Sequence, residues 1–209
     1  MNYKQVIESK YNREAWQQLL HDIFLSKVTF YTRPAAVHVS SRLAKEAFNL
    51  GRISLSDGES IAVYEIELND NVNIERNRRG IRDMLTSDWR NMGYAGAFMF
   101  CYRKNESVLR FSYVSETWGF NKQGEYEKIS TDTKRYTYLL GEGRGCRTAI
   151  EQFGILKSSK QSLSDITAAF SVEALTKQFY KDLFEWYQWA GDENSNVTFP
   201  NYVATEDDD

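Results

Sequence analysis

Apolar residues recur every three or four positions along several stretches of the chain, and this spacing predicts amphipathic helices. The first stretch covers residues 2–25 and is closed off by Thr32-Arg33-Pro34. The second covers residues 42–50, between two serines that can cap a helix and Gly51, a residue type common just after a helix end. Three further helices are predicted, at residues 74–85, 147–153 and 172–190.

Other apolar runs alternate or are continuous, and these predict β-strands. Residues 52–56 and 60–68 flank Asp57-Gly58, a dipeptide that favours a hairpin turn between two such runs. Residues 94–102 are apolar on both faces, so this strand is expected in the centre of a sheet. Two further strands are predicted, at residues 108–114 and 136–140. The order of elements indicates an α/β domain with a mixed β-sheet flanked by helices.

Length and composition set the domain organisation. The chain has 209 residues, of which 42% are hydrophobic and 14% aromatic, enough for one full domain with an appendage and too apolar for a disordered chain. We expect an α/β domain over residues 1–170, an amphipathic helix over 171–190 that docks on or leads to a following domain, and an acidic linker over 191–209. No apolar run reaches the roughly 20 residues of a membrane span, and no signal peptide is recognised. A cytoplasmic location without a membrane partner is expected.

Charge is distributed unevenly along the chain. The net charge is −3, but residues 191–209 hold six acidic residues and no Lys or Arg. The remaining residues carry 26 basic against 23 acidic side chains, and this mildly basic balance permits a nucleic-acid partner without requiring one. Two cysteines and two histidines provide neither a disulfide framework nor the usual ligands of a zinc site.

The most informative segment contains two glutamates on the predicted strand 60–68. Glu65 and Glu67 are two positions apart, so they point to the same face about 7 Å from each other. Carboxylate oxygens suit Mg²⁺, which can activate water for phosphodiester hydrolysis. The alternative is that this end of the strand has a solvated face.

Two segments that contain arginines can likewise be interpreted either as phosphate-binding or as purely structural. The predicted helix 74–85 carries four arginines that either contact phosphates or form a solvated face paired with Glu75 and Asp83. These arginines are Arg76, Arg78, Arg79 and Arg82. The glycine-rich turn 141–145 precedes a helix, where it either holds a phosphate or provides a turn with positive φ. Arg144 and Arg147 belong to this second segment.

Four segments in combination carry a resemblance to a known family. They are IAVYEIEL, NVNIERNRRGIRDML, RYTYLLGEGRGCRTAIEQF and EALTKQFYKDLFEWYQWA. Together, over roughly residues 40–200, they resemble the N-terminal region of fused type IIG restriction–modification enzymes. In those proteins a nuclease-like segment precedes an adenine-specific DNA methyltransferase and a target-recognition region.

The resemblance implies a nuclease module of the PD-(D/E)xK type, in which a hairpin brings an Asp and a D/E-x-K pair together around Mg²⁺ or Mn²⁺. On this sequence Glu65 is the second acid, and Glu67 stands where the Lys is usual. Asp57 is the nearest candidate for the first acid, although it lies only eight residues earlier. If Asp57 instead forms the turn, Ser54 lies near the expected acid position. Glu46, on the predicted helix 42–50, can supply a further carboxylate.

The function implied is that of a metal-dependent DNA endonuclease, acting in phage defence with a variant active site. Its partners would be double-stranded DNA, contacted by the six arginines above, and methyltransferase and target-recognition domains downstream in the same polypeptide. No adenine-methylation motif occurs in these residues. The alternative is a catalytically inactive module with the same fold that binds DNA or docks on a methyltransferase domain.

Overall fold

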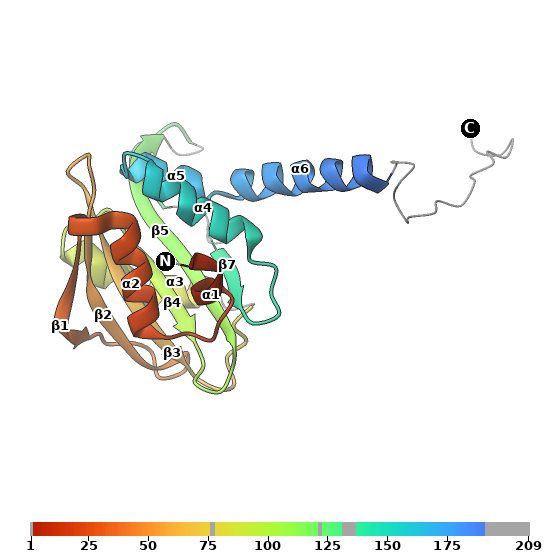
Figure 1. Ribbon diagram of the computed structural model, residues 1–209. Helices are drawn as coiled ribbons and strands as arrows, with labels where there is room; N and C mark the ends of the chain where they lie inside the picture. Colours follow the sequence, from red (N-terminus) through yellow and green to blue (C-terminus); the bar gives the residue numbers. More distant parts are fainter. Residues whose placement is uncertain (1, 76–77, 121–122, 131–136, 191–209) are drawn as a thin grey trace, which may run out of the picture.

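A mixed β-sheet with helices on both faces is the framework of the protein (Figure 1). The computed structural model describes residues 2–75, 78–120, 123–130 and 137–190. In these residues the strands are β1 (Val28–Ala36), β2 (Ala44–Ser54), β3 (Ser60–Leu68), β4 (Gly96–Tyr102), β5 (Val108–Phe120), β6 (Tyr126–Ser130) and β7 (Thr137–Gly141). The helices are α1 (Tyr3–Ile7), α2 (Arg13–Phe24), α3 (Arg78–Asn91), α4 (Arg147–Ser158), α5 (Leu163–Phe170) and α6 (Val172–Ala190), with a short 3₁₀ turn at Leu25–Lys27.

Strand order explains why the sheet is mixed. The strands follow the order β1-β2-β3-β4-β5-β6, and β7 pairs with β5 on the side away from β4. The pair β3–β4 is parallel and the other pairs are antiparallel. A parallel pair needs a crossover, and α3 provides it. The expectation of a mixed sheet flanked by helices is therefore confirmed.

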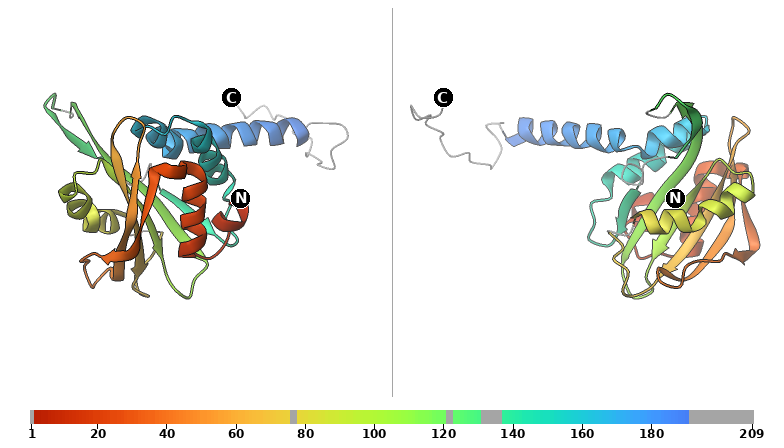
Figure 2. Two further views of the ribbon diagram at one scale, coloured as in Figure 1. Left: turned by 60° about the vertical axis from the view of Figure 1, so that its left-hand side comes forward. Right: turned by 180° about the vertical axis from the view of Figure 1, so that it is seen from behind.

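Each face of the sheet has its own apolar core. Figure 2 shows the helices on the two faces. Helices α1, α2, α4 and α5 cover one face, where buried aromatic rings from strands and helices meet. This cluster includes Trp16, Phe98, Phe100, Phe111, Phe153 and Phe170. Helix α3 covers the other face with Leu85 and Trp89. Strand β3 contributes to both cores, with Ile61 and Val63 on the α2 face and Ala62, Tyr64, Ile66 and Leu68 on the α3 face, as its alternation predicts.

The predicted helix over residues 42–50 is wrong, because residues 44–50 belong to strand β2. Two register shifts in the β2–β3 pairing, between Ala44 and Glu46 and between Asn49 and Gly51, interrupt its alternation. The bulge between Ala44 and Glu46 keeps Ala44 and Ala47 on the α3 face although they are three residues apart. Leu50, three residues further along, is buried in the core on the α2 face, so the spacing of buried residues imitates a helix. Glu46 therefore lies on a strand and not on a helix.

The single helix predicted over residues 2–25 is two helices. Asn12 caps α2 with its side-chain oxygen, which accepts a hydrogen bond from the backbone N–H of Ala15 at 2.8 Å. Because an N-cap residue has an extended backbone, the chain turns there and α1 is separated from α2. The apolar face predicted for this segment remains correct, since Trp16, Leu19 and Ile23 are all buried.

Most of the other elements agree with the sequence. The hairpin around Asp57-Gly58, the central position of β4, its pairing with β5, the strand β7 and the helices α4 and α6 are confirmed. Helix α3 begins four residues later than predicted and extends to Asn91. The elements β1, β6 and α5 were not predicted. Pro34 is tolerated in β1 because this strand lies at the sheet edge.

Helix α6 projects from the rest of the chain (Figure 1). Seven large apolar side chains on it are at least 45% exposed: Phe179, Tyr180, Leu183, Phe184, Trp186, Tyr187 and Trp189. The predicted linker over 191–209 lies outside the described residues. None of the helices in the described segments is long and apolar enough to cross a bilayer.

Two phenylalanines on the same strand test the account of the core. Phe111 is fully buried and packs against Phe98, Phe153 and Phe170, whereas Phe120 is 71% exposed. Phe111→Ala should lower the free energy of unfolding by about 3–5 kcal/mol in urea titrations, because it leaves a cavity. Phe120→Ala should change it by less than about 0.5 kcal/mol. Equal effects would contradict this assignment of the core.

Candidate functional site

The carboxyl ends of three strands lie at the same end of the sheet. Strands β3 and β4 are parallel, and β7 runs in the same direction because both β4 and β7 are antiparallel to β5. Their carboxyl ends therefore lie together, and ligands of α/β proteins commonly bind at the carboxyl ends of strands. Glu65 and Glu67 lie near the end of β3, and the β4–β5 turn adds residues beside them.

Glu65 is buried and fully engaged by neighbours from the N-terminal segment. Its side chain is 2% exposed, Tyr11 donates a hydrogen bond to Oε2 at 2.8 Å, and Arg13 donates from Nε at 2.9 Å and from Nη2. Such a two-point contact between guanidinium and carboxylate is among the strongest polar interactions in proteins. The hydrogen bonds to Glu65 raise the pKa of Arg13, and burial, with Glu65 nearby, raises the pKa of Tyr11.

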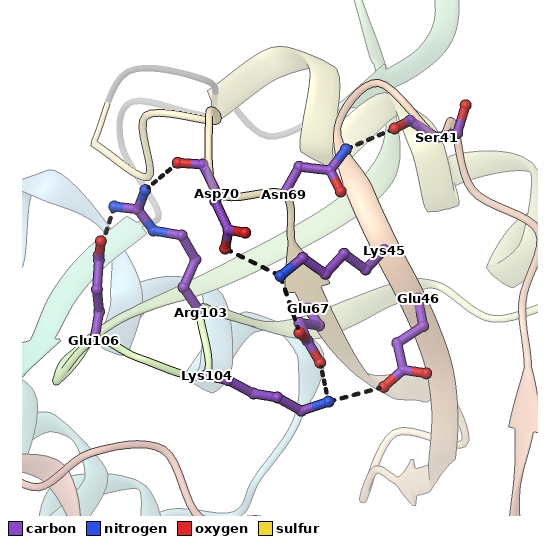
Figure 3. A network of polar contacts seen from close by, with 9 residues as sticks. All are labelled: Ser41, Lys45, Glu46, Glu67, Asn69, Asp70, Arg103, Lys104 and Glu106. Carbon is purple, nitrogen blue, oxygen red and sulfur yellow. Dashed lines mark hydrogen bonds and ion pairs between the residues drawn. The ribbon is translucent and has the colours of Figure 1, made fainter.

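Glu67 is also buried but its partners are lysines (Figure 3). Its side chain is 3% exposed; Lys104 Nζ lies 2.8 Å from Oε2, and Lys45 Nζ lies 3.6 Å from Oε1. Oε2 accepts no aligned hydrogen bond in the described part of the chain, so Lys104 compensates its charge as an ion pair. Lys45 also donates to Asp70 at 3.0 Å. The pKa of Lys104 is raised chiefly by Glu67, and that of Lys45 chiefly by Asp70.

A second carboxylate lies across from Glu67 on the neighbouring strand. Glu46 and Glu67 are paired residues of β2 and β3. Side chains of directly paired residues lie on one face with Cβ atoms about 5 Å apart. Lys104 Nζ is 4.0 Å from Glu46 Oε1, so one ammonium group contacts both carboxylates (Figure 3). We call Glu46, Glu67, Lys45 and Lys104 the strand-end cluster.

Loops beside the strand-end cluster are held by their own polar contacts. Arg103 donates to the backbone oxygen of Asp70 at 2.9 Å and pairs with Glu106 across the β4–β5 turn. Asn69 donates to the backbone oxygen of Ser41 at 2.6 Å. These contacts fix the loop after β3 against the start of β2 and against the turn that carries Lys104 (Figure 3).

The charge of this region leaves room for a further cation. Among the described side chains, four carboxylates pair with three cationic groups here, a formal excess of one negative charge. The carboxylates are Glu46, Glu65, Glu67 and Asp70, and the cations are Arg13, Lys45 and Lys104. A divalent cation would change the excess to one positive charge, which suits an anionic phosphate ligand.

The donor set fits Mg²⁺ but not a closed metal cage. In the described residues no group of three or more His, Cys, Asp or Glu side chains is arranged to hold a metal. Mg²⁺ is commonly held by one or two carboxylates together with waters and substrate phosphates, and Glu46 with Glu67 meets that minimum. Both oxygens of Glu65 are engaged by Tyr11 and Arg13, so Glu65 is less suited as a ligand.

Asp57 is not brought to the glutamates. It lies in the β2–β3 turn, at the other end of β3. Its Oδ1 accepts from the backbone N–H of Glu59, and its Oδ2 accepts from that of Leu163 at 2.7 Å, near the start of α5. Ser54 pairs with Ser60 at the same distant end. The interpretation of Asp57 as a turn former is therefore correct, and Glu46 is the acid that lies beside Glu67.

The glycine-rich turn lies at the same end of the sheet as the two glutamates. Gly141 and Gly143 have φ of 108° and 73°, as expected of a turn that needs positive φ. Arg144 in this turn pairs with Glu75 at 2.7 Å, in the loop after β3. Arg147 instead pairs with Glu151 at 3.0 Å and with Asp182 of α6 at 3.3 Å. Arg144 thus lies near the strand ends, whereas Arg147 links α4 to α6.

The four arginines predicted near α3 are only partly within the described structure. Arg76 lies outside the described residues, and α3 begins at Arg78. The side chains of Arg78, Arg79 and Arg82 also lie outside the description, so their predicted DNA contacts stay predictions. The first turn of α3 lies near the start of β2, since Gly80 is adjacent to Leu43.

Several residues of the site were missed by sequence reasoning. They are Tyr11, Arg13, Lys45, Asp70 and Lys104. A signal was available for Arg13, because Asn12 before it is a typical N-cap and places it in the first turn of α2. Lys45 was visible beside Glu46 but was assigned to a helix. Nothing local connects Lys104 with Glu67, since 37 positions separate them along the chain.

Comparisons with known proteins assign no family. No protein-family model, curated protein or solved structure matches this sequence.

The ion pair between buried Glu65 and partly exposed Arg13 gives a test of the site's electrostatics. Arg13→Met leaves Glu65 buried with an uncompensated charge and should lower the free energy of unfolding at pH 7 by about 3 kcal/mol. Urea titrations at pH 7 measure this loss.

Arg147→Met is the matched control for this experiment. Arg147 is 61% exposed and its ion pairs are at the surface, so the same substitution should change stability by less than about 1 kcal/mol. Equal losses in Arg13→Met and Arg147→Met would contradict the proposed dependence of Glu65 on Arg13.

Proposed function

We propose that this chain is a metal-dependent DNA endonuclease domain of a restriction–modification enzyme. The observation that carries the proposal is the strand-end cluster, in which buried Glu67 lies beside Glu46 of the neighbouring strand and two lysines. Metal-dependent phosphodiester hydrolysis uses carboxylates to hold a divalent cation and positive groups to contact the phosphate. Carboxylates and positively charged groups occur together at this end of the sheet.

The resemblance to type IIG enzymes supports the same proposal from the sequence side. A PD-(D/E)xK module carries its acids on a hairpin of a mixed sheet flanked by helices. Here β2 and β3 form such a hairpin, and Glu46 replaces the predicted Asp57 as the first acid. The family has a lysine at the position of Glu67. In this chain Lys45 and Lys104 provide amino groups at that place from other strands and turns.

Each group in the site has a distinct part in the proposed reaction. Mg²⁺ or Mn²⁺ held by Glu46 and Glu67 would supply an activated water and charge stabilisation for the phosphate. Glu65 holds the guanidinium of Arg13, whose side chain is 36% exposed and keeps N–H groups free of Glu65 for a phosphate oxygen. Glu65 is thus a positioning residue.

The proposed partners follow from the same chemistry. Double-stranded DNA would approach the edge at which β3, β4 and β7 end, with Arg144 near it and the arginines of α3 predicted to add phosphate contacts. The downstream methyltransferase and target-recognition domains, and a cytoplasmic location, belong to this proposal through the resemblance alone.

A non-catalytic module is the second candidate, and two observations favour it. Both buried glutamates are already neutralised by cationic side chains. In addition, the exposed aromatic residues of α6 form a surface suited to contact with another domain. In this alternative the protein keeps the fold and binds DNA or docks on a methyltransferase domain.

Metal binding separates the two candidates. Calorimetric titration of Mn²⁺ into the full chain, with a short DNA duplex present, should show saturable binding. Glu67→Gln should abolish it, because the variant removes a carboxylate ligand. Glu151→Gln, at a surface ion pair of α4, should bind as the wild type does. Absence of binding in the wild type with and without duplex would favour the non-catalytic module.

DNA cleavage is the direct test of the activity. With Mn²⁺ or Mg²⁺, the wild-type chain should nick or linearise supercoiled plasmid, and chelation should stop it. Glu67→Gln should lose at least about 10²-fold in rate while retaining its circular dichroism spectrum. Unchanged cleavage by Glu67→Gln would reject this residue as a metal ligand.

A further inference from the structure

We infer that the ammonium group of Lys104 occupies the cation position between Glu46 and Glu67 and is displaced when a divalent cation binds there. The inference rests on the proposed function. It adds that the chain carries its own competitor for the metal, which becomes a free positive group beside the metal once it is displaced.

Geometry places Lys104 where a cation would be. Its Nζ lies 2.8 Å from Glu67 Oε2 and 4.0 Å from Glu46 Oε1, so it contacts carboxylates of two adjacent strands (Figure 3). Like charges directly opposite in a sheet repel each other, and the cost rises when one of them is buried. The ammonium relieves this repulsion in the metal-free protein, as a metal ion would.

Lys104 is attached in a way that permits this exchange. Its side chain is 66% exposed, so its head group can move into water without desolvation. The neighbouring Arg103 is held by Asp70 and Glu106, which keeps the turn in place while the lysine side chain moves. In the described part of the chain its ion pairs are with Glu46 and Glu67, the two residues that would become metal ligands.

The other cations of the site are bound differently. Arg13 holds Glu65 by two hydrogen bonds, a geometry that a metal ion would not displace readily. Lys45 is 3.6 Å from Glu67 but 3.0 Å from Asp70, so its main partner lies outside the pair of glutamates. Lys104 is therefore distinguished by position and not by charge alone, and this difference can be tested.

The test compares two lysine variants of equal charge. Mn²⁺ is titrated calorimetrically into the wild type, Lys104→Met and Lys45→Met, each as the full chain with and without a short DNA duplex. Without duplex, Lys104→Met should bind Mn²⁺ about three- to fivefold more tightly than the wild type, because the ammonium of the exposed Lys104 side chain no longer competes. Lys45→Met should show a clearly smaller gain.

Thermal unfolding gives a second readout that does not depend on activity. Without metal, Lys104→Met should melt at a lower temperature than the wild type, because Glu46 and Glu67 then lack the shared cation. Saturating Mn²⁺ should remove most of this difference. In the wild type, diamagnetic Mg²⁺ should also shift the side-chain resonance of Lys104 that Lys104→Met removes.

The outcomes separate this inference from the proposed function. The inference would be overturned if Lys104→Met bound Mn²⁺ no more tightly than the wild type, or if Lys45→Met gained as much affinity as Lys104→Met. In either case, Mn²⁺ binding by the wild type would still support the endonuclease proposal. Binding by none of the three chains, even with duplex, would overturn both.

Discussion

Burial of two carboxylates on the central strand β3 is the constraint on which this structure depends. Glu65 and Glu67 are almost fully removed from water, and an isolated buried carboxylate is far too costly to keep charged. Each must therefore be paired, and the partners come from distant parts of the chain. Arg13 comes from α2, Lys45 from β2 and Lys104 from the β4–β5 turn.

These pairings also determine how the elements are arranged around the sheet edge. Tyr11 and Arg13 tie the start of α2 to Glu65, so the N-terminal helices and the end of β3 are positioned together. Arg103 and Lys45 both contact Asp70 and connect the loop after β3 to its neighbours. A site built in this way is rigid around Glu65 and more adaptable around Glu67, where exposed lysines provide the charge.

The two glutamates therefore differ in the chemistry they can support, although both lie on the same face of β3. Glu65 is committed to a guanidinium and acts through it, whereas Glu67 and its neighbour Glu46 share an ammonium that water can solvate. In our proposal, a divalent cation replaces a monovalent one between Glu46 and Glu67 and not at Glu65. This difference is why the endonuclease proposal depends on Glu67 and Glu46 and assigns Glu65 a positioning role.

The sequence alone determined the features that arise from local patterns. Alternation along β3 placed both glutamates on one face, Asp57-Gly58 gave the hairpin, and continuous apolarity put β4 in the middle of the sheet. Only the tertiary structure decided which acids meet. Bulges in β2 gave this strand a helix-like spacing of buried residues, so the pairing of Glu46 with Glu67 was not predicted. Asp57 lies at the far end of β3 from the glutamates, because it belongs to the β2–β3 turn. The partnership of Lys104 with Glu67 joins residues far apart in sequence, and such a contact is created by the packing of strands, for which no local pattern of residues exists.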